Sequence, residues 1–476
     1  MATGARVVGT IALVLVLGAG AYVTADAHDV VPGPLTLEPS PTPPPPFPTA
    51  PGAVDAPDAT AALTVPDPQA PVPAPARIQA LVDELARDDR LGTPSRVGVV
   101  VADQLTGDVL GTHLPDAGRT PASTAKLVTA VAALDTFAGD ATVSTRVVQG
   151  EGDDLVLVGG GDMMLAADKG DPTAVRGRAG LGDLARATAA KLELAGTTSV
   201  RLRWDDSLFS GPAVNPAWDP ADLAAGYVAP VTPLAVQIGA TRPFRSAEDY
   251  PPRYPFPAYE AAQVFAKRLT EAGIAVQGTP TRTVAPEGAL EIAAVRSAPI
   301  PQIVDYLLET SDNTITEVVA RLVAVAQGLP GSFEGGTQAV LRAVQQVGVS
   351  TAGAHLSDAS GLGKGSQLRP AMLVDLVRLA TDPSQPKLRT AAIGMPIAGL
   401  TGTLADRYTH SPARGMLRAK TGSLQSVTAL SGTVLDADGR LLVFTVIADK
   451  TGAIGQAVPR TAIDEFGTTL ASCGCH

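Results

Sequence analysis

Cysteine is nearly absent from this chain. Only two of the 476 residues are cysteines, Cys473 and Cys475, and they form a C-x-C just before the C-terminal His476. Two sulfurs cannot build a disulfide framework or a four-ligand zinc set, so neither class of protein is indicated. The two cysteines either pair with each other or stay free, and we expect neither a metal site nor a cofactor.

Basic runs are missing as well. The chain has 36 Lys and Arg residues against 47 Asp and Glu residues, a formal net charge of −11, and no segment rich in Lys or Arg. A nucleic-acid surface needs a basic footprint, so nucleic acid is excluded as a partner. Hydrophobic residues make up 45% of the sequence, which is ample for a core, and the length allows two or three domains.

Two common catalytic signatures are also lacking. There is no G-x-S-x-G elbow, and the candidate bases His113, His355 and His410 have no paired context, which argues against a Ser-His-Asp hydrolase. The glycine run 159–161 is not followed by G-K-[ST] or by a G-x-G-x-x-G helix start, so it is not a phosphate loop.

The N-terminus has the pattern of an export signal. Arg6 precedes an apolar run from Val7 to Val23, and Ala25-Asp26-Ala27 follows as a small-x-small cleavage site. The run is also about long enough to span a bilayer. Residues 1–27 are therefore predicted to be a signal peptide or an N-terminal membrane anchor, which places the rest of the chain outside the cytoplasm, in the cell envelope.

A proline-rich stretch follows. Residues 28–75 are rich in Pro, Ala, Thr and Asp, and proline is nearly unbroken from Pro41 to Pro48. Such a composition cannot bury enough apolar surface to fold, and it favours extended polyproline geometry. We interpret it as a disordered linker between the N-terminal segment and a catalytic part.

From residue 76 the sequence predicts a mixed α/β domain with an interruption. Helical and strand patterns alternate at first, short strands, glycine clusters and turns fill 142–292, and longer helices then precede a group of strands. The predicted helices are 76–86, 121–137, 300–310, 313–327, 336–347, 371–380 and 456–470, and the predicted strands outside the interruption are 97–103, 107–110, 416–420, 426–436 and 440–449. One domain is thus formed by 76–141 and 293–476, with a β-rich insert at 142–292.

The first candidate motif, Ser123-Thr124-Ala125-Lys126, opens a predicted helix. Residues three apart project from the same helix face, so the Ser123 hydroxyl and the Lys126 amine can meet. A serine needs a base within hydrogen-bond reach, and lysine serves only if burial or a nearby cation lowers its pKa. A lone match is more often a solvated helix face, and Ser384-Gln385-Pro386-Lys387 matches the pattern too, in a proline turn.

The second motif is Ser311-Asp312-Asn313. Asn313 is one of only two asparagines in the chain, the other being Asn215, so composition does not readily produce this match. In a turn between helices the two side chains could line one side of a cleft. They could equally cap the helix that follows, and both interpretations can hold together.

The third motif, Lys420-Thr421-Gly422, is followed by Ser423-Leu424. It lies beside an edge-like strand, where a cation and a hydroxyl can bind a substrate carboxylate and Gly422 lets backbone approach closely. The competing copy at 450–452 follows an apolar strand and is interpreted as a loop leading into the last helix.

In this order the motifs form the set found in penicillin-binding proteins and class A β-lactamases. Three further stretches narrow the resemblance to one family within this set: 157–162 (LVGGGD), 358–362 (DASGL) and 399–404 (GLTGTL). Over about residues 76–470 the chain resembles the D-alanyl-D-alanine carboxypeptidase/endopeptidase family of low-molecular-mass class C penicillin-binding proteins, the S13 serine peptidases. This implies a serine β-lactamase/transpeptidase-like α/β (α+β) domain with an insert between the first two motifs. The implied partners are peptidoglycan stem peptides and β-lactams.

The resemblance also implies a catalytic role for five residues. Ser123 would form the acyl-enzyme, with Lys126 as its general base. Ser311 would relay a proton to the leaving D-alanine, Asn313 would hold the peptide amide, and Lys420 would tune the electrostatics of the site.

Substrate binding is implied for a second group. Thr421 and Ser423 would bind the terminal carboxylate, with Gly422 and Leu424 completing the strand, and the amides of Ser123 and Ser423 would form the oxyanion hole. The family also has a pocket for the diaminopimelate side chain, whose aromatic and acidic part Trp218, Asp222 and Tyr227 resemble. Lys364 stands where some relatives carry arginine, which weakens a bidentate carboxylate clamp.

Two alternatives remain. A class A β-lactamase shares the motifs but adds a Glu with a downstream Asn for fast deacylation, and no asparagine follows Asn313. We therefore predict slow deacylation of penicillin. A non-catalytic penicillin-binding scaffold or sensor is the other alternative, and the intact Ser123, Lys126 and Lys420 argue against it.

Overall fold

The computed structural model describes residues 17–28, 30–31, 35, 66–246, 249–452 and 455–475. The chain divides into the units Met1–Ala62 and Leu63–His476. In the first unit, residues 17–27 are helical. Among the residues described, no helix has both the length and the apolar character that a bilayer crossing requires. The predicted signal or anchor lies partly outside the described residues, and the predicted linker lies mostly outside them.

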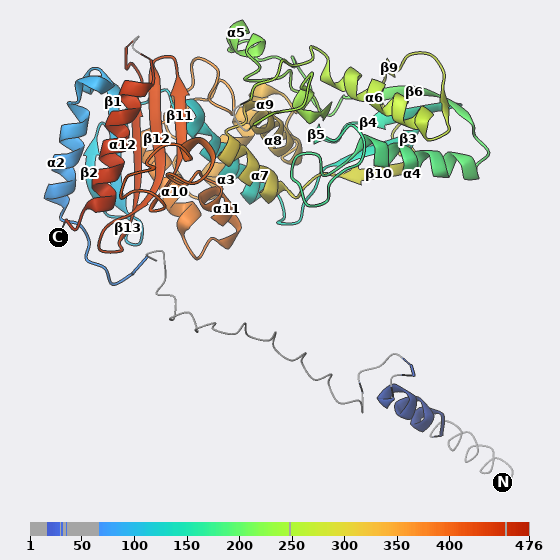
Figure 1. Cartoon of the computed structure of the whole chain (residues 1–476), viewed down its shortest axis with the longest axis horizontal. Helices are drawn as coiled ribbons and strands as arrows, with labels where there is room; N and C mark the ends of the chain where they lie inside the picture. Colours follow the sequence, from blue (N-terminus) through green and yellow to red (C-terminus); the bar gives the residue numbers. More distant parts are fainter. Residues whose placement is uncertain are drawn as a thin grey trace, which may run out of the picture. The chain divides into compact units, whose positions relative to one another are not determined.

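The second unit is built around a five-stranded antiparallel sheet. Its order is β11-β12-β13-β1-β2, which leaves β11 at an edge. The strands are β1 (Val97–Asp103), β2 (Val109–His113), β11 (Leu417–Leu424), β12 (Val427–Leu435) and β13 (Leu441–Ala448). The first and last strands of the chain pair with each other, so residues on either side of the insert form one domain (Figure 1).

Helices cover both faces of this sheet. The valines of β1 show the reason: Val97, Val99 and Val101 belong to one apolar cluster, and Val100 belongs to another. A strand buried on both faces is apolar throughout rather than alternating. One face is covered by α2 (Pro75–Ala86) and α12 (Ala457–Ser472). On the other face α10 (Pro370–Thr381) packs against the strands. The same apolar cluster continues into α3 (Lys126–Thr136), α7 (Ile300–Thr310), α8 (Asn313–Ala326), α9 (Phe333–Gln346) and α11 (Arg389–Ile393).

Most predicted elements of this domain are confirmed, and two differ in a way that matters for the motifs. The helix predicted at 121–137 starts as a 3-10 turn, η3 (Ala122–Ala125), before α3 begins at Lys126. The strand predicted at 416–420 continues to Leu424, so the third motif lies within β11 rather than beside it. The remaining short 3-10 helices are η1 (Asp89–Leu91), η2 (Pro94–Arg96), η5 (Pro386–Leu388) and η6 (Gly402–Leu404).

The insert has its own sheet and core. The sheet order is β10-β3-β4-β6-β8, with β9 also paired to β6. The strands are β3 (Ser144–Gln149), β4 (Asp154–Val158), β6 (Ser199–Asp205), β8 (Ala275–Val276), β9 (Thr281–Arg282) and β10 (Glu291–Arg296), and β5 (Asp162–Leu165) pairs separately with β7 (Leu234–Val236). Short helices α5 (Pro220–Ala224) and η4 (Gln237–Gly239) lie in its connections.

Two longer helices of the insert were not predicted. α4 (Leu181–Leu194) and α6 (Pro257–Glu271) pack on the insert sheet and share its apolar core. Alanine supplies much of their buried faces, for example Ala185 and Ala189 in α4 and Ala261 in α6. Alanine contrasts weakly with its polar neighbours in hydropathy, so the helical period is faint in the sequence. The insert sheet also reaches Arg296, beyond the predicted boundary at 292.

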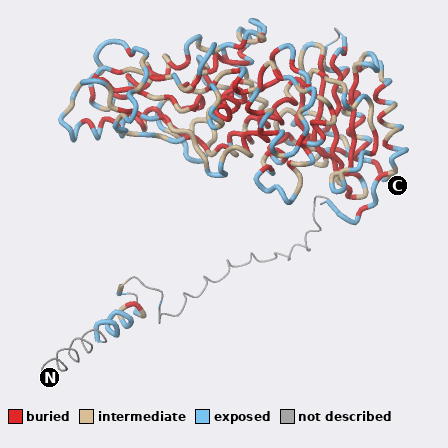
Figure 2. The backbone as a smooth tube through the Cα atoms, turned by 180° about the vertical axis from the view of Figure 1, so that it is seen from behind, coloured by how far each residue is buried: buried red, intermediate tan, exposed pale blue. Residues whose placement is uncertain are grey.

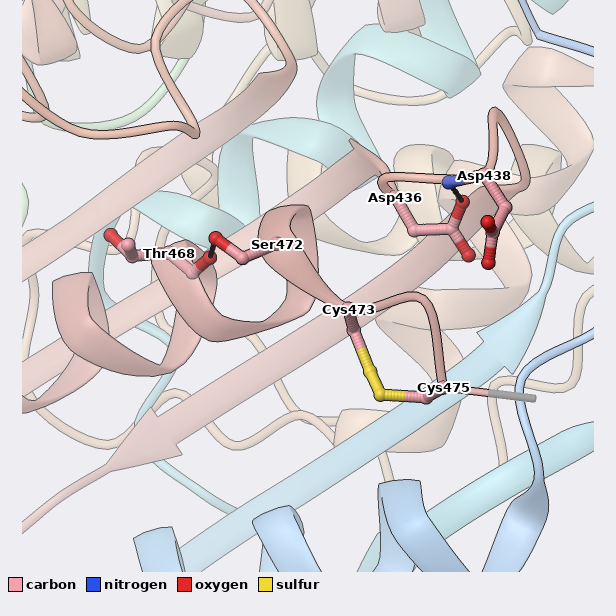
Figure 3. The surroundings of a disulfide bond; sticks show 6 residues. All are labelled: Asp436, Asp438, Thr468, Ser472, Cys473 and Cys475. Atoms are coloured by element: carbon pink, nitrogen blue, oxygen red, sulfur yellow. Dashed lines mark hydrogen bonds between the residues drawn. A yellow bond between two sulfur atoms is a disulfide. The ribbon is translucent and has the colours of Figure 1, made fainter.

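The two cysteines are paired. Cys473 and Cys475 form a disulfide at the end of α12 (Figure 3). The bond closes a very short loop, which removes little entropy from the unfolded chain. The sequence left this pairing open.

Candidate active site

Ser123 lies in η3, directly before α3. The preceding residue, Ala122, has φ 47°, a left-handed conformation that costs energy for any residue with a Cβ. This turn is packed from two sides by glycines. A Cβ on Gly361 would lie 1.9 Å from the Ala122 carbonyl oxygen, and one on Gly422 would lie 2.7 Å from the Pro121 carbonyl oxygen. The turn that carries Ser123, named the nucleophile turn for the role proposed below, is therefore held between the 358–363 loop and strand β11.

Lys126 is the buried centre of the site. Its Nζ donates to Ser123 Oγ at 2.8 Å, to Asn313 Oδ1 at 2.7 Å and to the Ser360 carbonyl at 2.9 Å. The side chain is fully buried. Burial lowers the pKa of Lys126 to about 8, against the opposing effect of the nearby Asp358, Glu317 and Asp312 charges. A lysine in this state can give up a proton near neutral pH and then accept one from a serine.

The second motif forms the turn between α7 and α8. Ser311 ends α7 with φ 59°, and Asp312 caps α8 by accepting a hydrogen bond from the Ile315 amide at 2.8 Å. The cap is therefore Asp312, not Ser311 or Asn313. This leaves both of the outer side chains of the motif available to the site.

Asn313 and Lys420 connect the remaining motifs. Asn313 Nδ2 donates to the Tyr227 carbonyl at 2.9 Å while its Oδ1 holds Lys126. Lys420 Nζ donates to Ser311 Oγ at 2.9 Å. Burial, and then the charge of Lys126, lower the pKa of Lys420 well below its usual value. The three predicted motifs thus meet in one hydrogen-bonded cluster.

Successive side chains of β11 point to opposite sides of the strand. Lys420 faces the buried cluster, and its neighbours Thr421 and Ser423 face the opposite side of the strand. There Thr421 Oγ1 lies 2.7 Å from Thr403 Oγ1, and Ser423 Oγ accepts from Arg460 Nη2 at 3.0 Å. Leu424 is half-buried at the end of the strand, and its carbonyl accepts from the Gln456 side chain.

A pair of buried carboxyl groups, Glu317 and Asp358, supports the site, and the sequence alone assigned a role to neither. Glu317 accepts from the amides of Ala359 and Ser360 at 3.2 and 2.8 Å. Burial, and then the charge of Asp358, raise the pKa of Glu317 to about 8. Glu317 follows Asn313 by one helical turn, in an otherwise apolar helix, which is a signal that sequence reasoning could have used.

Asp358 organises the loop on which Lys126 rests. Its carboxylate accepts from the amides of Gly361 and Gly363 at 2.8 and 2.6 Å and from Trp218 Nε1 at 2.7 Å. Together with Glu317 it fixes the Ser360 carbonyl that Lys126 contacts. Among the described residues, no three His, Cys, Asp or Glu side chains gather as metal ligands would.

The four predicted pocket residues come together but differ in exposure. Trp218 is only 5% exposed, packs edge-on against Phe333 and donates to Asp358, so most of its ring supports the 358–363 loop. Tyr227 is 45% exposed beside Tyr250, and burial, then the charge of Asp219, raise the pKa of Asp222. Lys364 is exposed and lies 3.5 Å from Asp219.

The competing motif copies lie elsewhere. Ser384 and Lys387 are exposed, and Lys387 donates to the Asp135 carbonyl instead of to a serine. Lys450 is exposed in the loop between β13 and α12. Neither copy joins a buried cluster.

A serine and a buried lysine beneath the edge strand of an antiparallel sheet are the arrangement of the serine β-lactamase and penicillin-binding class. Sequence comparison identifies the family within that class. Residues 78–248 and 253–472 match the D-Ala-D-Ala carboxypeptidase 3 (S13) family, and the chain belongs to it.

Named relatives agree with this assignment. The chain is 38% identical over 432 residues to a carboxypeptidase of Mycobacterium tuberculosis, covering 85% of this chain and 90% of the relative. It is 40% identical over 362 residues to carboxypeptidase DacB of Mycolicibacterium smegmatis, covering 75% and 76%. The predicted family and the predicted enzyme class, a serine-type D-Ala-D-Ala carboxypeptidase, are confirmed.

The fold is similar to that of a solved penicillin-binding protein. The crystal structure of penicillin-binding protein 4 from Haemophilus influenzae matches with a TM-score of 0.67 at 20% identity, covering 82% of this chain and 99% of that chain. At this identity the likeness shows the fold alone. The predicted fold class is confirmed.

Proposed function

We propose that this chain cleaves D-alanyl-D-alanine bonds of peptidoglycan stem peptides through an acyl-enzyme on Ser123. The observation that carries the proposal is the 2.8 Å contact between Lys126 Nζ and Ser123 Oγ in a fully buried environment. Neutral Lys126 takes the proton of Ser123 as Oγ attacks the carbonyl carbon of the penultimate D-alanine.

Ser311 and Lys420 assist the departure of the terminal D-alanine. When the C–N bond breaks, the amine of the terminal D-alanine needs a proton. Ser311 passes one to it and receives in return the proton that Lys126 took from Ser123, which leaves Lys126 neutral again. Lys420, 2.9 Å from the Ser311 oxygen, stabilises the charge that develops on that hydroxyl during transfer. Water then hydrolyses the ester on Ser123 and releases the shortened peptide.

The substrate lies along the free edge of β11. The backbone amides of Ser123 and Ser423 stabilise the oxyanion, Asn313 holds the peptide amide, and Thr421 and Ser423 receive the terminal carboxylate. The close approach of Gly422 to Pro121 supports this geometry because it brings the strand against the nucleophile turn. Asp222, Tyr227 and Lys364 form the rim that receives the stem-peptide side chain.

β-Lactams are expected to acylate the same serine. Their strained amide presents a carbonyl and a carboxylate to the same groups as the peptide does. With no Glu and Asn pair of the class A type, the acyl-enzyme deacylates slowly, and rapid turnover of nitrocefin would contradict this.

The enzyme acts outside the cytoplasm, because its substrate is cell-wall peptidoglycan. We propose that residues 1–27 export the chain or hold it at the membrane, and that the proline-rich segment 28–75 spaces the catalytic unit from that point. Detection of the mature N-terminus by mass spectrometry distinguishes the two: a start near residue 28 indicates cleavage.

Two experiments test the proposed function. Fluorescent penicillin should label the wild type and not Ser123→Ala, whereas labelling that survives the substitution would contradict the assignment of the nucleophile. Incubation with purified muropeptides then identifies the reaction. Free D-alanine indicates carboxypeptidase activity and cleaved cross-bridges indicate endopeptidase activity, while the absence of both would refute the proposal.

A further inference from the structure

Arg460 lies beside the substrate-binding strand although it is distant from every motif in the sequence. It comes from the start of α12, and its Nη2 donates to Ser423 Oγ at 3.0 Å. Ser423 follows the K-T-G motif on β11, so the contact brings a guanidinium to the strand proposed to receive the substrate carboxylate.

Among the described residues, Arg460 has no ion-pair partner. Within the described part of the chain, no carboxylate lies within 4.0 Å of its guanidinium nitrogens. The nearest candidate on its own helix, Asp464, is one turn further on and is engaged by Arg407. Arg460 Nε is buried with no hydrogen-bond partner. Burial, and then the charge of Arg407, lower the pKa of Arg460 while Asp464 and Asp406 oppose them, yet arginine stays protonated at neutral pH.

The surroundings of Arg460 suit a carboxylate. Thr421 and Ser423 project from the same side of β11, and Thr403 Oγ1 lies 2.7 Å from Thr421 Oγ1 on that side. Ser423 is half-buried, so the group is partly shielded from water. A hydrogen bond to a charged donor is stronger in such a setting than one between neutral groups.

We propose that Arg460 determines specificity for a free C-terminal carboxylate by binding that group together with Ser423. The proposal rests on the proposed function, because it concerns the same peptide on the same strand. Arg460 is a substrate-binding residue in this scheme and takes no part in proton transfer. A C-terminal amide presents no negative charge to the guanidinium, so its binding lacks the attraction between opposite charges.

The test compares two substrates in four proteins. The substrates are diacetyl-L-lysyl-D-alanyl-D-alanine and the same peptide ending in D-alaninamide. The proteins are the full-length wild type, Arg460→Gln, Arg460→Lys, and Arg87→Gln as a matched control. Arg87 lies on α2, and its side chain is 72% exposed. The measured quantity is kcat/KM for release of the C-terminal residue, with active enzyme counted by penicillin labelling.

Arg460→Gln should lower kcat/KM for the free acid by roughly 10- to 100-fold, the usual size of a charged hydrogen-bond contribution. For the amide the decrease should be much smaller, about threefold or less, because its neutral carbonyl oxygen gains little from the charge of the guanidinium. Arg460→Lys should fall between wild type and Gln, since it keeps the charge and loses the planar fork. Arg87→Gln should match the wild type on both substrates.

The outcomes separate this proposal from the proposed function. An equal loss on acid and amide indicates a structural role for Arg460 and overturns the proposal, as does an unchanged rate on the acid. Equal wild-type rates on the two substrates also overturn it. If Arg460→Gln does not fold, the acid-to-amide ratio of Arg460→Lys decides the question. A wild type that cleaves neither peptide refutes the proposed function itself.

Discussion

At the scale of single residues, the candidate site holds a lysine where burial disfavours its charged form. Lys126 is fully buried yet touches three oxygen acceptors, one of them the proposed nucleophile. The two buried carboxyls, Glu317 and Asp358, oppose the effect of burial, so its pKa settles near 8 rather than far lower. At pH 7 roughly a tenth of the enzyme then holds a neutral Lys126, against a negligible share for an unperturbed lysine.

The pH dependence of acylation follows from this value. The second-order rate of penicillin labelling should rise with pH and reach half its maximum near pH 8, as Lys126 loses its proton. The folded-state pKa lies below the unfolded value of 10.5, so the contribution of Lys126 to stability rises with pH between the two. Labelling measured from pH 6 to 10 checks the profile, and a flat curve over this range would rule out Lys126 as the titrating base.

A substitution tests the same residue. Lys126→Arg should lower the labelling rate by about 10²- to 10⁴-fold and remove the rise with pH, because arginine cannot serve as a base. Lys387→Arg is a matched control, since Lys387 belongs to the exposed second copy of the motif. It should label like the wild type, and equal losses in the two variants would argue against a special role for Lys126.

At the scale of elements, the proposed mechanism depends on how closely β11 approaches the turn that carries Ser123. The strand lies at the sheet edge, and Gly422 is the point of closest approach. A Cβ there would lie 2.7 Å from the Pro121 carbonyl oxygen and 3.3 Å from Ala122 Cβ. Both neighbours belong to the turn that carries Ser123, so the turn and the strand cannot remain in place if this position gains a side chain.

Gly422→Ala is therefore expected to impair acylation more than stability. Pushing β11 away from the turn displaces the Ser423 amide from the oxyanion, and errors approaching 1 Å cost about 10²-fold in rate. Penicillin labelling kinetics and thermal unfolding measure the two effects. Gly139→Ala is the control, because a Cβ at that position meets nothing within 4 Å. Normal labelling by Gly422→Ala would contradict the proposed oxyanion hole.

At the scale of the whole catalytic unit, the insert is joined to the domain that carries the motifs. Figure 2 shows buried backbone continuing through the centre of this unit, where α8 is almost entirely buried. Arg321 of α8 donates to the carbonyls of Pro212 at 2.9 Å and Gly331 at 3.3 Å. Its guanidinium also stacks over the rings of Phe333 and Phe209, at 4.1 and 5.5 Å. The cation thus links the segment after β6 to the helices behind the active site.

Arg321→Met should lower the free energy of unfolding by about 3 kcal/mol, because it removes the charged hydrogen bonds to the Pro212 and Gly331 carbonyls and the stacking on Phe333. Thermal or chemical unfolding measures the change. Arg342→Met, on the exposed side of α9, should change stability by no more than about 0.5 kcal/mol. A stability equal to wild type in Arg321→Met would show that the insert does not depend on this contact.

The sequence by itself determined the identity and order of the motifs, the helices and strands that carry them, and the family they indicate. These are local properties, since a serine and a lysine one turn apart and an apolar run with a sharp turn are visible without the fold. The tertiary structure decided which copy of each motif meets the others, and it brought in residues from distant segments. Glu317 is a partial exception, because its helical spacing from Asn313 is readable.

Arg460 and Trp218 show why contacts between distant segments could not be predicted from the sequence. Arg460 reaches Ser423 only because α12 packs across the sheet, and none of the three motifs that form the site lies near it in the chain. Trp218 resembles a pocket residue in the sequence, and the fold adds a buried hydrogen bond from its Nε1 to Asp358. Burial and long-range contact are set by the packing of the whole unit, and they decide whether a charged or aromatic side chain supports the site or meets the substrate.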